Sequence, residues 1–165
     1  MALGNNSFGI KLRDMLWPDS RQRLVEILCD EYADAVKDVA QFQEHAQRMT
    51  YPGFRDRLLR IAEQEKAHAE WLGSKIRALG GAIPEARFTI QNGRNSWECL
   101  RMDAEEERRD YTWILERVYA VAEKADPEIA LGLRRIHEEE KRHRAEFLDM
   151  LIKSDPQASL VGDHL

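Results

Sequence analysis

The few Gly and Pro residues of this chain are gathered at a small number of places. They divide it into four long stretches: 19–50, 52–79, 96–125 and 127–153. Within each stretch, apolar residues recur three and four positions apart, which is the period of an amphipathic helix. At 1.5 Å per residue, helices of this length are ~40 Å long. The sequence therefore predicts four long helices whose apolar faces meet in a shared core.

The ends of these helices carry start signals. Pro52 and Pro127 suit the first helical position, where a backbone N–H is not needed. Asp126 is placed to cap the last helix, and Asn95 followed by Glu98 resembles a capping pair for the third. These signals support the boundaries that the periodicity predicts.

The connections predict how the helices are arranged. Short breaks near 51–53 and 126–127 make the first two and the last two helices antiparallel hairpins, whereas the connection over 80–95 is much longer. Two hairpins joined by one long crossover have ferritin-like connectivity rather than that of a simple up-and-down bundle. We therefore expect an all-α, ferritin-like four-helix bundle over 19–153, with an N-terminal extension (1–18) and a flexible C-terminal tail (154–165).

The composition narrows the class of protein. The 165 residues include 25 Lys+Arg and 30 Asp+Glu, a net charge of −5 without a basic run, which argues against nucleic acid or an anionic membrane as a partner. No stretch of ~18 apolar residues predicts a membrane span. The N-terminus lacks a signal-peptide pattern, which favours a cytoplasmic protein. The two Cys residues form no CxxC motif, so neither a zinc ribbon nor a rubredoxin-type iron site is predicted.

The two hairpins look like copies of one another. Residues 52–68 align with 127–143 at an offset of 75, and eight of the 17 positions are identical. Leu and Ile would match in any two amphipathic helices, but Pro, Glu and His at fixed offsets would not. A duplicated hairpin predicts a pseudo-twofold bundle in which two equivalent sites face each other.

Each copy carries a Glu-x-x-His motif, Glu65 with His68 and Glu140 with His143. Residues three positions apart project from one helix face, a single turn apart, so both side chains can reach one metal ion. Both motifs also continue the apolar stripe of their helix, where charged groups are costly unless they are paired or bind metal. The motifs therefore predict a metal site in the bundle interior.

The first and third helices offer further ligands at matching positions. Glu31 precedes Glu65 by 34 residues, and Glu107 precedes Glu140 by 33. One Glu from each of two helices and a Glu-x-x-His from each of the other two form the carboxylate di-metal arrangement of helix bundles. Six ligands, mostly oxygen, with one imidazole for each metal, suit Fe(II) or Mn(II) better than Zn.

These motifs resemble the ferritin-like di-iron carboxylate family, and most of all its rubrerythrin-like branch, without a rubredoxin domain. The resemblance covers about residues 20–153 and implies a centre of two Fe ions, with Mn as the alternative metal. It also implies a role for each motif residue: bridging, catalytic carboxylates at Glu65 and Glu140, terminal ligands at Glu31 and Glu107, and one metal bound by each of His68 and His143.

The chain departs from the rubrerythrin pattern at two positions. Rubrerythrins have a further Glu three residues after the third-helix ligand, where this chain has Asp110, and often a Tyr where this chain has Asp38. Because Asp is shorter than Glu, Asp110 either ligates directly or supports the site through a hydrogen bond or a water. Asp38 lies seven residues after Glu31 on the same face and is an acidic neighbour of the site.

Two further assignments stay open. The extra residue between Glu31 and Glu65 is placed in the 50–53 turn; if it lies inside the helix instead, Asp34 replaces Glu31 on the site face. His137, one turn before Glu140, has either a structural role or a supporting role beside the metal.

The resemblance implies a di-iron oxidoreductase that reacts with hydrogen peroxide or dioxygen, as a peroxidase or ferroxidase. An external electron donor is expected because no rubredoxin domain is present. Two alternatives stay open: an oxygen-activating hydroxylase of an organic substrate, and a non-catalytic iron-storage or metal-binding bundle. We expect a homodimer or larger homo-oligomer, in which a dimer favours the oxidoreductase and a large cage favours storage.

Overall fold

The computed structural model describes residues 18–107 and 111–154, and it contains helices and loops without a strand in these ranges. Five helices lie in these ranges: α2 (Pro18–Gln47), α3 (Pro52–Ala78), α4 (Ser96–Glu106), α5 (Tyr111–Ala125) and α6 (Pro127–Lys153). The expected all-α class is therefore confirmed for the described residues. Most of the predicted extension and tail, 1–17 and 155–165, lies outside the described residues. No helix in the described ranges is long and apolar enough to cross a membrane.

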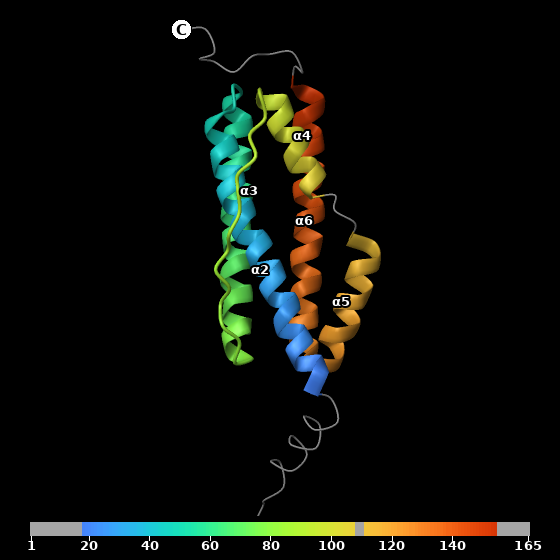
Figure 1. Cartoon of the computed structure of the whole chain (residues 1–165). Coiled ribbons are helices and arrows are strands. Elements are labelled where there is room, and N and C mark those ends of the chain that lie inside the picture. The colour runs from blue at the N-terminus through green and yellow to red at the C-terminus, as the bar shows by residue number, and fades with distance from the viewer. Residues whose placement is uncertain (1–17, 108–110, 155–165) are drawn as a thin grey trace, which may run out of the picture.

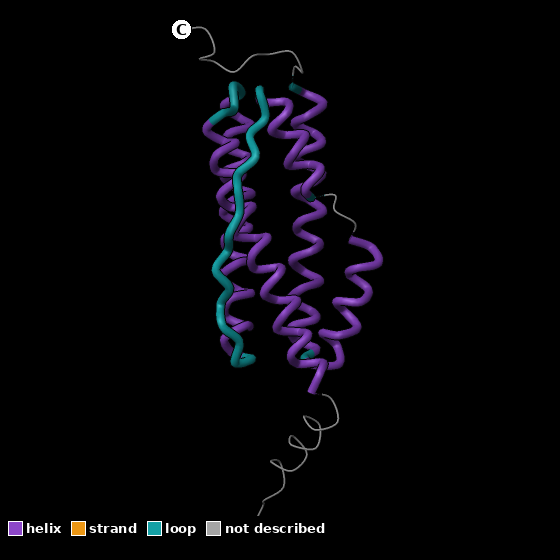
Figure 2. The backbone as a smooth tube through the Cα atoms, in the orientation of Figure 1, coloured by secondary structure: helices purple, strands orange, loops and turns teal. Residues whose placement is uncertain are grey.

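The helices form two antiparallel hairpins side by side (Figure 1). The first consists of α2 and α3, and in the second α4 and α5 run antiparallel to α6. The crossover between α3 and α4 contains no helix or strand and runs along the length of the bundle (Figure 2). This is the connectivity that the loop lengths predict.

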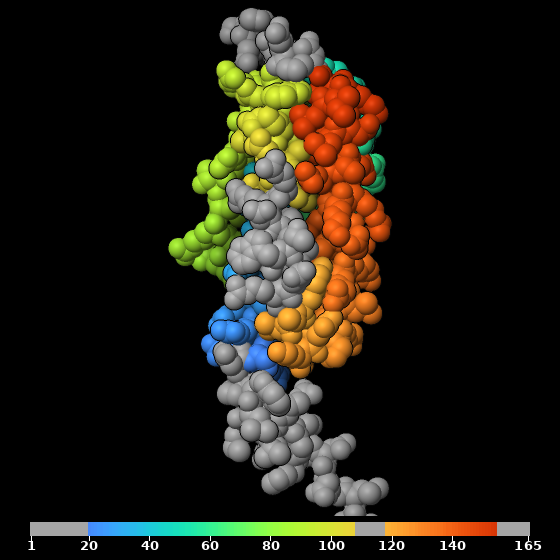
Figure 3. Space-filling view, turned by 90° about the vertical axis from the view of Figure 1, so that its right-hand side faces the viewer, coloured from blue at the N-terminus to red at the C-terminus, as the bar shows by residue number. Residues whose placement is uncertain are grey.

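The third helix of the bundle differs from the prediction. The stretch 96–125 was expected as one helix, but the structure has α4 and α5 on either side of 108–110. α4 lies beside the upper half of α6 and α5 beside its lower half (Figure 3). Apolar spacing continues through both helices, so periodicity does not reveal the break. The carboxyl end of α4 carries Glu105, Glu106 and Glu107, and negative charge there is disfavoured by the helix dipole.

The predicted helix ends are confirmed where they can be checked. Pro52 and Pro127 occupy the first turn of α3 and α6. The Asp126 side chain accepts hydrogen bonds from two backbone N–H groups of the first turn of α6, and Asn95 accepts one from Glu98 N–H at 2.8 Å. Gly80, at φ +80°, follows α3 in the left-handed region that favours glycine.

A buried ion pair attaches the crossover to the bundle. His45 on α2 and Asp103 on α4 are both fully buried. The His45 ring donates from Nδ1 to Asp103 Oδ1 at 2.8 Å and from Nε2 to the carbonyl oxygen of Gln91 at 2.7 Å. Burial opposes a charge on this ring, but the hydrogen bond to Asp103, the contact with Cys99 and the negative charge of Asp103 together outweigh burial and raise the pKa of His45 to about 10. His45 therefore acts as an imidazolium clamp between α2, α4 and the crossover.

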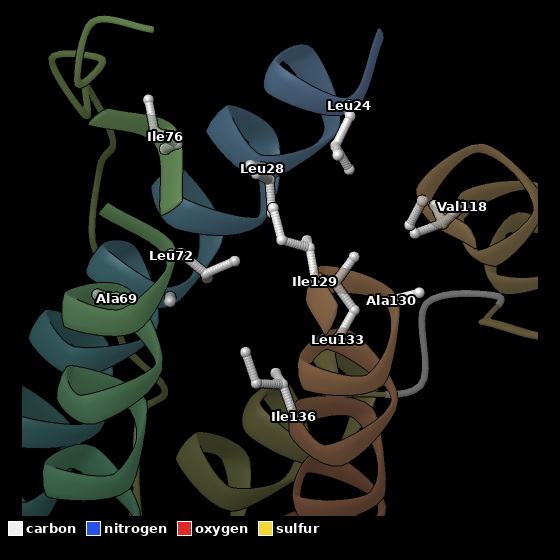
Figure 4. Close-up of a cluster of buried hydrophobic side chains, with 12 residues drawn as sticks. Leu24, Leu28, Ala69, Leu72, Ile76, Val118, Ile129, Ala130, Leu133 and Ile136 are labelled. Carbon is white, nitrogen blue, oxygen red and sulfur yellow. The ribbon is translucent and has the colours of Figure 1, made fainter. Parts of the chain in front are cut away.

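The apolar core consists of two clusters. One fills the lower half of the bundle, where Leu28, Leu72 and Ile129 point into the space between α2, α3 and α6 (Figure 4). The other contains Phe42 and Phe147, whose ring centroids lie 5.2 Å apart. Along α3 and α6, a layer of buried acidic and imidazole side chains, called here the polar layer, falls between the residues of the two clusters: Glu65 and His68 on α3, and His137 and His143 on α6.

Candidate metal centre

The polar layer consists of Glu and His side chains that several helices contribute at one level along the bundle axis. Within it, two groups of three side chains each bring one possible ligand atom to within 4.8 Å of the others. The first group is Glu65, Glu107 and His143, and the second is Glu31, His137 and Glu140. The family resemblance implies six metal ligands, and five of them lie in these two groups. The sixth, His68, does not.

The first group is buried on all sides. Exposed fractions are 2% for Glu65, 7% for Glu107 and 2% for His143. His143 Nδ1 lies 2.9 Å from Glu65 Oε1 and 3.8 Å from Glu107 Oε1, while its Nε2 donates to Gln64 Oε1 at 3.1 Å. The hydrogen bond to Gln64 therefore orients the His143 ring so that Nδ1 points toward the carboxylates of Glu65 and Glu107.

The second group includes a histidine that the motif does not assign. His137 is 1% exposed, and its Nε2 lies 3.4 Å from Glu31 Oε2. Its Nδ1 is hydrogen-bonded to the Tyr119 hydroxyl at 2.7 Å, and the Arg134 guanidinium stacks on the Tyr119 ring at 4.2 Å. The structure thus places His137 next to an expected ligand rather than at a distant structural position.

His68 is oriented differently from the expectation. The resemblance implies that it binds one of the two metals; in this structure it belongs to neither group, its Nδ1 lies 3.1 Å from Glu65 Oε2 and its Nε2 donates to Glu139 Oε2 at 2.8 Å. The Glu65 carboxylate therefore lies between the imidazoles of His68 and His143, whose ring centroids are 6.1 Å apart. This central position is the one expected of a bridging carboxylate.

The remaining predicted residues lie at the edge of the layer or outside it. Asp34 is exposed, whereas Glu31 faces His137 and Glu140, so the helix register places Glu31 at the site. Asp38 is largely buried, beside Glu107 and Glu65. Asp110 lies outside the described residues.

Several polar atoms of this layer are buried without a hydrogen-bond partner. In the described part of the chain six buried side-chain atoms make no hydrogen bond of good geometry, and four belong here: Asp38 Oδ1, Glu65 Oε1, Glu140 Oε2 and His143 Nδ1. Glu65 Oε1 and His143 Nδ1 lie 2.9 Å apart as an ion pair, so Asp38 Oδ1 and Glu140 Oε2 are the two that lack any partner. A buried polar atom without a partner typically costs about 1–3 kcal/mol, so such atoms rarely gather without a ligand. Carboxylate oxygens and an imidazole nitrogen are donors that Fe(II) and Mn(II) accept, so these residues fit a metal centre.

The electrostatics of the polar layer also favour a bound cation. Burial, followed by repulsion from Glu31, Glu107 and Glu65, raises the pKa of Glu140 to about 9. Burial and the nearby Glu107 and Glu65 also raise the pKa of Asp38 well above its usual value. The layer therefore holds more carboxylates than it can ionise together, and bound cations would relieve this repulsion.

Sequence reasoning missed Gln64, Glu139 and Tyr119, the outer partners of the site histidines. The repeat contains a signal for two of them, because Gln64 and Glu139 each come one residue before a motif Glu and align at the offset of 75. Tyr119 lies on the displaced α5 and has no such signal.

Comparison with known proteins identifies the fold. No family model and no curated protein matches the sequence. Among solved structures, bacterioferritin of Desulfovibrio desulfuricans, described with its diiron site, matches with a TM-score of 0.72 at 23% identity over 81% of each chain. A ferritin-like diiron-carboxylate protein of Bacillus anthracis str. Ames matches with a TM-score of 0.69 at 20% identity, over 81% of this chain and 98% of that one. These likenesses confirm the ferritin-like bundle, and the rubrerythrin-like branch stays a prediction.

Proposed function

We propose that this protein binds two Fe ions in the polar layer and is a di-iron oxidoreductase. The observation that carries the proposal is that two groups of three carboxylate and imidazole side chains converge inside a ferritin-like bundle, with the Glu140 Oε2 and Asp38 Oδ1 atoms buried there without a hydrogen-bond partner. The proposed ligands are one Glu from each of two helices and two Glu-x-x-His pairs: Glu31, Glu65, His68, Glu107, Glu140 and His143. Mn is the alternative metal for the same oxygen-rich set.

The chain's own residues have separate tasks in this proposal. Glu65 and Glu140 would be ligands of the metals, and Glu65 lies between the two motif histidines. In the metal-free state Glu140 keeps its proton at neutral pH, because burial and repulsion from Glu31, Glu107 and Glu65 raise its pKa to about 9, and hydrogen bonds to Glu107 and Glu65 raise the pKa of His143 to about 9 against the effect of burial. Metal uptake therefore displaces protons from these side chains. His137 holds Glu31 from the outer side.

When bound, the two Fe ions supply the electrons for reduction of hydrogen peroxide or dioxygen, and the protein sets their geometry and charge. The proposal includes an external electron donor, and the two Cys of the chain form no CxxC motif. This corresponds to a peroxidase or a ferroxidase.

Iron storage is the second candidate, favoured by the likeness to a bacterioferritin. The two functions predict different assemblies, because storage needs a closed cage whereas peroxide or dioxygen chemistry needs only a dimer. Sizing of the purified protein by light scattering distinguishes them. A large cage that retains many Fe ions per chain would favour storage.

The metal centre is tested by anaerobic Fe(II) titration and metal analysis. The parent protein should bind two Fe(II) per chain, and the Glu65→Ala/Glu140→Ala variant should bind none. A matched control is Glu63→Ala/Glu138→Ala, which removes two acids of the same repeat whose side chains are 71% and 60% exposed. The control should still bind two Fe(II). Far-UV circular dichroism establishes that both variants are folded.

The reaction is tested on the Fe(II)-loaded protein. Addition of peroxide or dioxygen should change its absorption spectrum, and reduction should restore the starting spectrum. Full Fe(II) binding without any spectral change would overturn the oxidoreductase and leave a metal-binding bundle. Equal Fe(II) binding by the parent and the Glu65→Ala/Glu140→Ala variant would overturn the site itself.

A further inference from the structure

The outer nitrogens of the two motif histidines make equivalent contacts across the bundle. His68 Nε2 donates to Glu139 Oε2 at 2.8 Å, and His143 Nε2 donates to Gln64 Oε1 at 3.1 Å. Gln64 and Glu139 align at the repeat offset of 75. Each motif histidine is thus held by the residue that comes just before the motif Glu of the opposite hairpin.

These contacts determine which ring nitrogen faces the polar layer. A hydrogen bond donated from Nε2 keeps the proton on that nitrogen and turns Nδ1 inward. In both histidines Nδ1 does face Glu65, at 3.1 Å for His68 and 2.9 Å for His143. The two rings are also deeply buried, at 5% and 2% exposed, so their orientation is set by these partners.

The two halves of the repeat differ in the residue that accepts the hydrogen bond from the histidine. Glu139 offers a carboxylate, whereas Gln64 offers a neutral amide oxygen. A carboxylate that accepts the N–H bond pulls the proton outward and makes the opposite nitrogen a stronger electron donor to a metal, and an amide does this less. The two imidazoles therefore differ as ligands although their own motifs are identical.

We propose that Glu139 and Gln64 make the two metal positions inequivalent, so that the position of His68 binds a divalent metal more tightly than the position of His143. The inference rests on the proposed di-metal centre and assigns positioning roles to two residues that contact no metal. It also predicts that the metal at His68 favours the higher oxidation state, because a stronger donor stabilises the more positive ion.

His137 is a second source of asymmetry, because it lies 3.4 Å from Glu31 and its repeat partner is Ala62. The carboxylates that contact His68 are Glu65 of α3 and Glu139 of α6. An exchange of acceptors isolates the contribution of Glu139 and Gln64, because it leaves His137 and all the proposed ligands unchanged.

The test uses Co(II) as a redox-stable probe in calorimetric titrations of the full chain. The parent should bind two Co(II) with dissociation constants that differ by about tenfold or more, since loss of an outer partner typically costs 10–100-fold in affinity. Glu139→Gln should weaken the tighter position by about tenfold, and Gln64→Glu should tighten the weaker position. The double exchange Gln64→Glu/Glu139→Gln should reverse which histidine holds the tighter metal.

The reversal is read by NMR of the Co(II) protein, in which exchangeable ring N–H protons of ligating histidines are strongly shifted by the paramagnetic ion. Each single exchange should move one of the two resonances and leave the other in place. Glu138→Gln is the matched control: it removes one charge from the neighbouring position, where the side chain is 60% exposed and paired with Lys141. It should change neither affinity by more than about twofold, since exposed pairs contribute little.

Two results would overturn the inference. One is a parent protein whose two Co(II) bind with equal affinity, and the other is a Glu139→Gln variant that weakens both positions alike or behaves like Glu138→Gln. Either result leaves the proposed di-metal centre intact. A parent protein that binds no Co(II) and no Fe(II) overturns the centre and this inference together. Circular dichroism of each metal-free variant shows that the exchange has not unfolded the bundle.

Discussion

Some side chains of the polar layer lower the stability of the metal-free protein because their ionisable groups are buried close together. Glu140 is the clearest case, because burial and repulsion from Glu31, Glu107 and Glu65 raise its pKa to about 9. Its Oε2 atom is also buried without a hydrogen-bond partner. Such a carboxyl weakens the metal-free protein at neutral pH, which is a cost that proteins tolerate at functional sites.

We predict that Glu140→Gln stabilises the metal-free protein at pH 7 to 8. The unfolded carboxyl ionises near its ordinary pKa, whereas the folded one stays protonated until about pH 9, so folding binds a proton and stability falls as the pH rises between these values. The variant removes this loss, and its advantage should vanish near pH 4.5. Melting temperatures of chelator-treated proteins from pH 4.5 to 8 check this, and a variant that melts below the parent at pH 8 would contradict it.

At the scale of elements, the position of α4 depends on contacts outside any periodic pattern. α4 spans 11 residues and ends beside Glu107. Asp103, one turn earlier, is held by His45 of α2 and also accepts a hydrogen bond from the Gln41 amide at 3.1 Å. Because His45 also binds the Gln91 carbonyl, one imidazolium joins α2, α4 and the crossover. The clamp therefore helps to set the height at which Glu107 enters the polar layer.

We predict that the stability contributed by His45 is lost as the pH rises. Its folded pKa, raised to about 10 by Asp103 against the effect of burial, exceeds the ordinary value of 6.5, so the contribution is complete below about pH 6.5 and disappears as the pH rises toward 10. His45→Gln should cost about 3 kcal/mol at pH 6, as removal of one partner of a buried ion pair does. Urea unfolding of parent and variant from pH 6 to 10 measures the difference, which should narrow steadily; a constant difference would refute the charged clamp.

At the scale of the whole molecule, the polar layer separates two apolar clusters and receives side chains from both hairpins. α2 and α3 supply Glu31, Glu65 and His68, while α6 supplies Glu140 and His143. Metal bound here would connect the hairpins across the pseudo-twofold arrangement. Binding to the folded state alone stabilises a protein by mass action.

We predict that metal loading raises the melting temperature of the whole bundle. At a free metal concentration of 100 times the dissociation constant, one bound ion adds about 2.7 kcal/mol, which corresponds to several degrees for a domain of this size. Scanning calorimetry with Mn(II), followed by a chelator, should show a reversible increase. The Glu65→Ala/Glu140→Ala variant should show none, and an equal increase in that variant would place the metal elsewhere.

Much of the fold could be predicted from the sequence because helix formation and hairpin pairing depend on local information. Apolar periodicity, Pro52 and Pro127 at helix starts and the Asp126 cap all act within a few residues, and all are confirmed. The repeat likewise located Glu65 and Glu140 on corresponding helix faces. The division of the third helix was not predicted, because the apolar pattern continues on both sides of it.

The sequence by itself determined the helices, their hairpin order, and the two Glu-x-x-His faces that turn toward the interior. Only the tertiary structure decided the partners of those faces: Glu31 rather than Asp34 beside Glu140, His137 with Tyr119, and the unequal acceptors Glu139 and Gln64. The physical reason is that helical periodicity specifies a direction around one helix axis. The rotation and height of each helix against its neighbours come from packing of the two apolar clusters and from clamps such as His45, which no local pattern encodes.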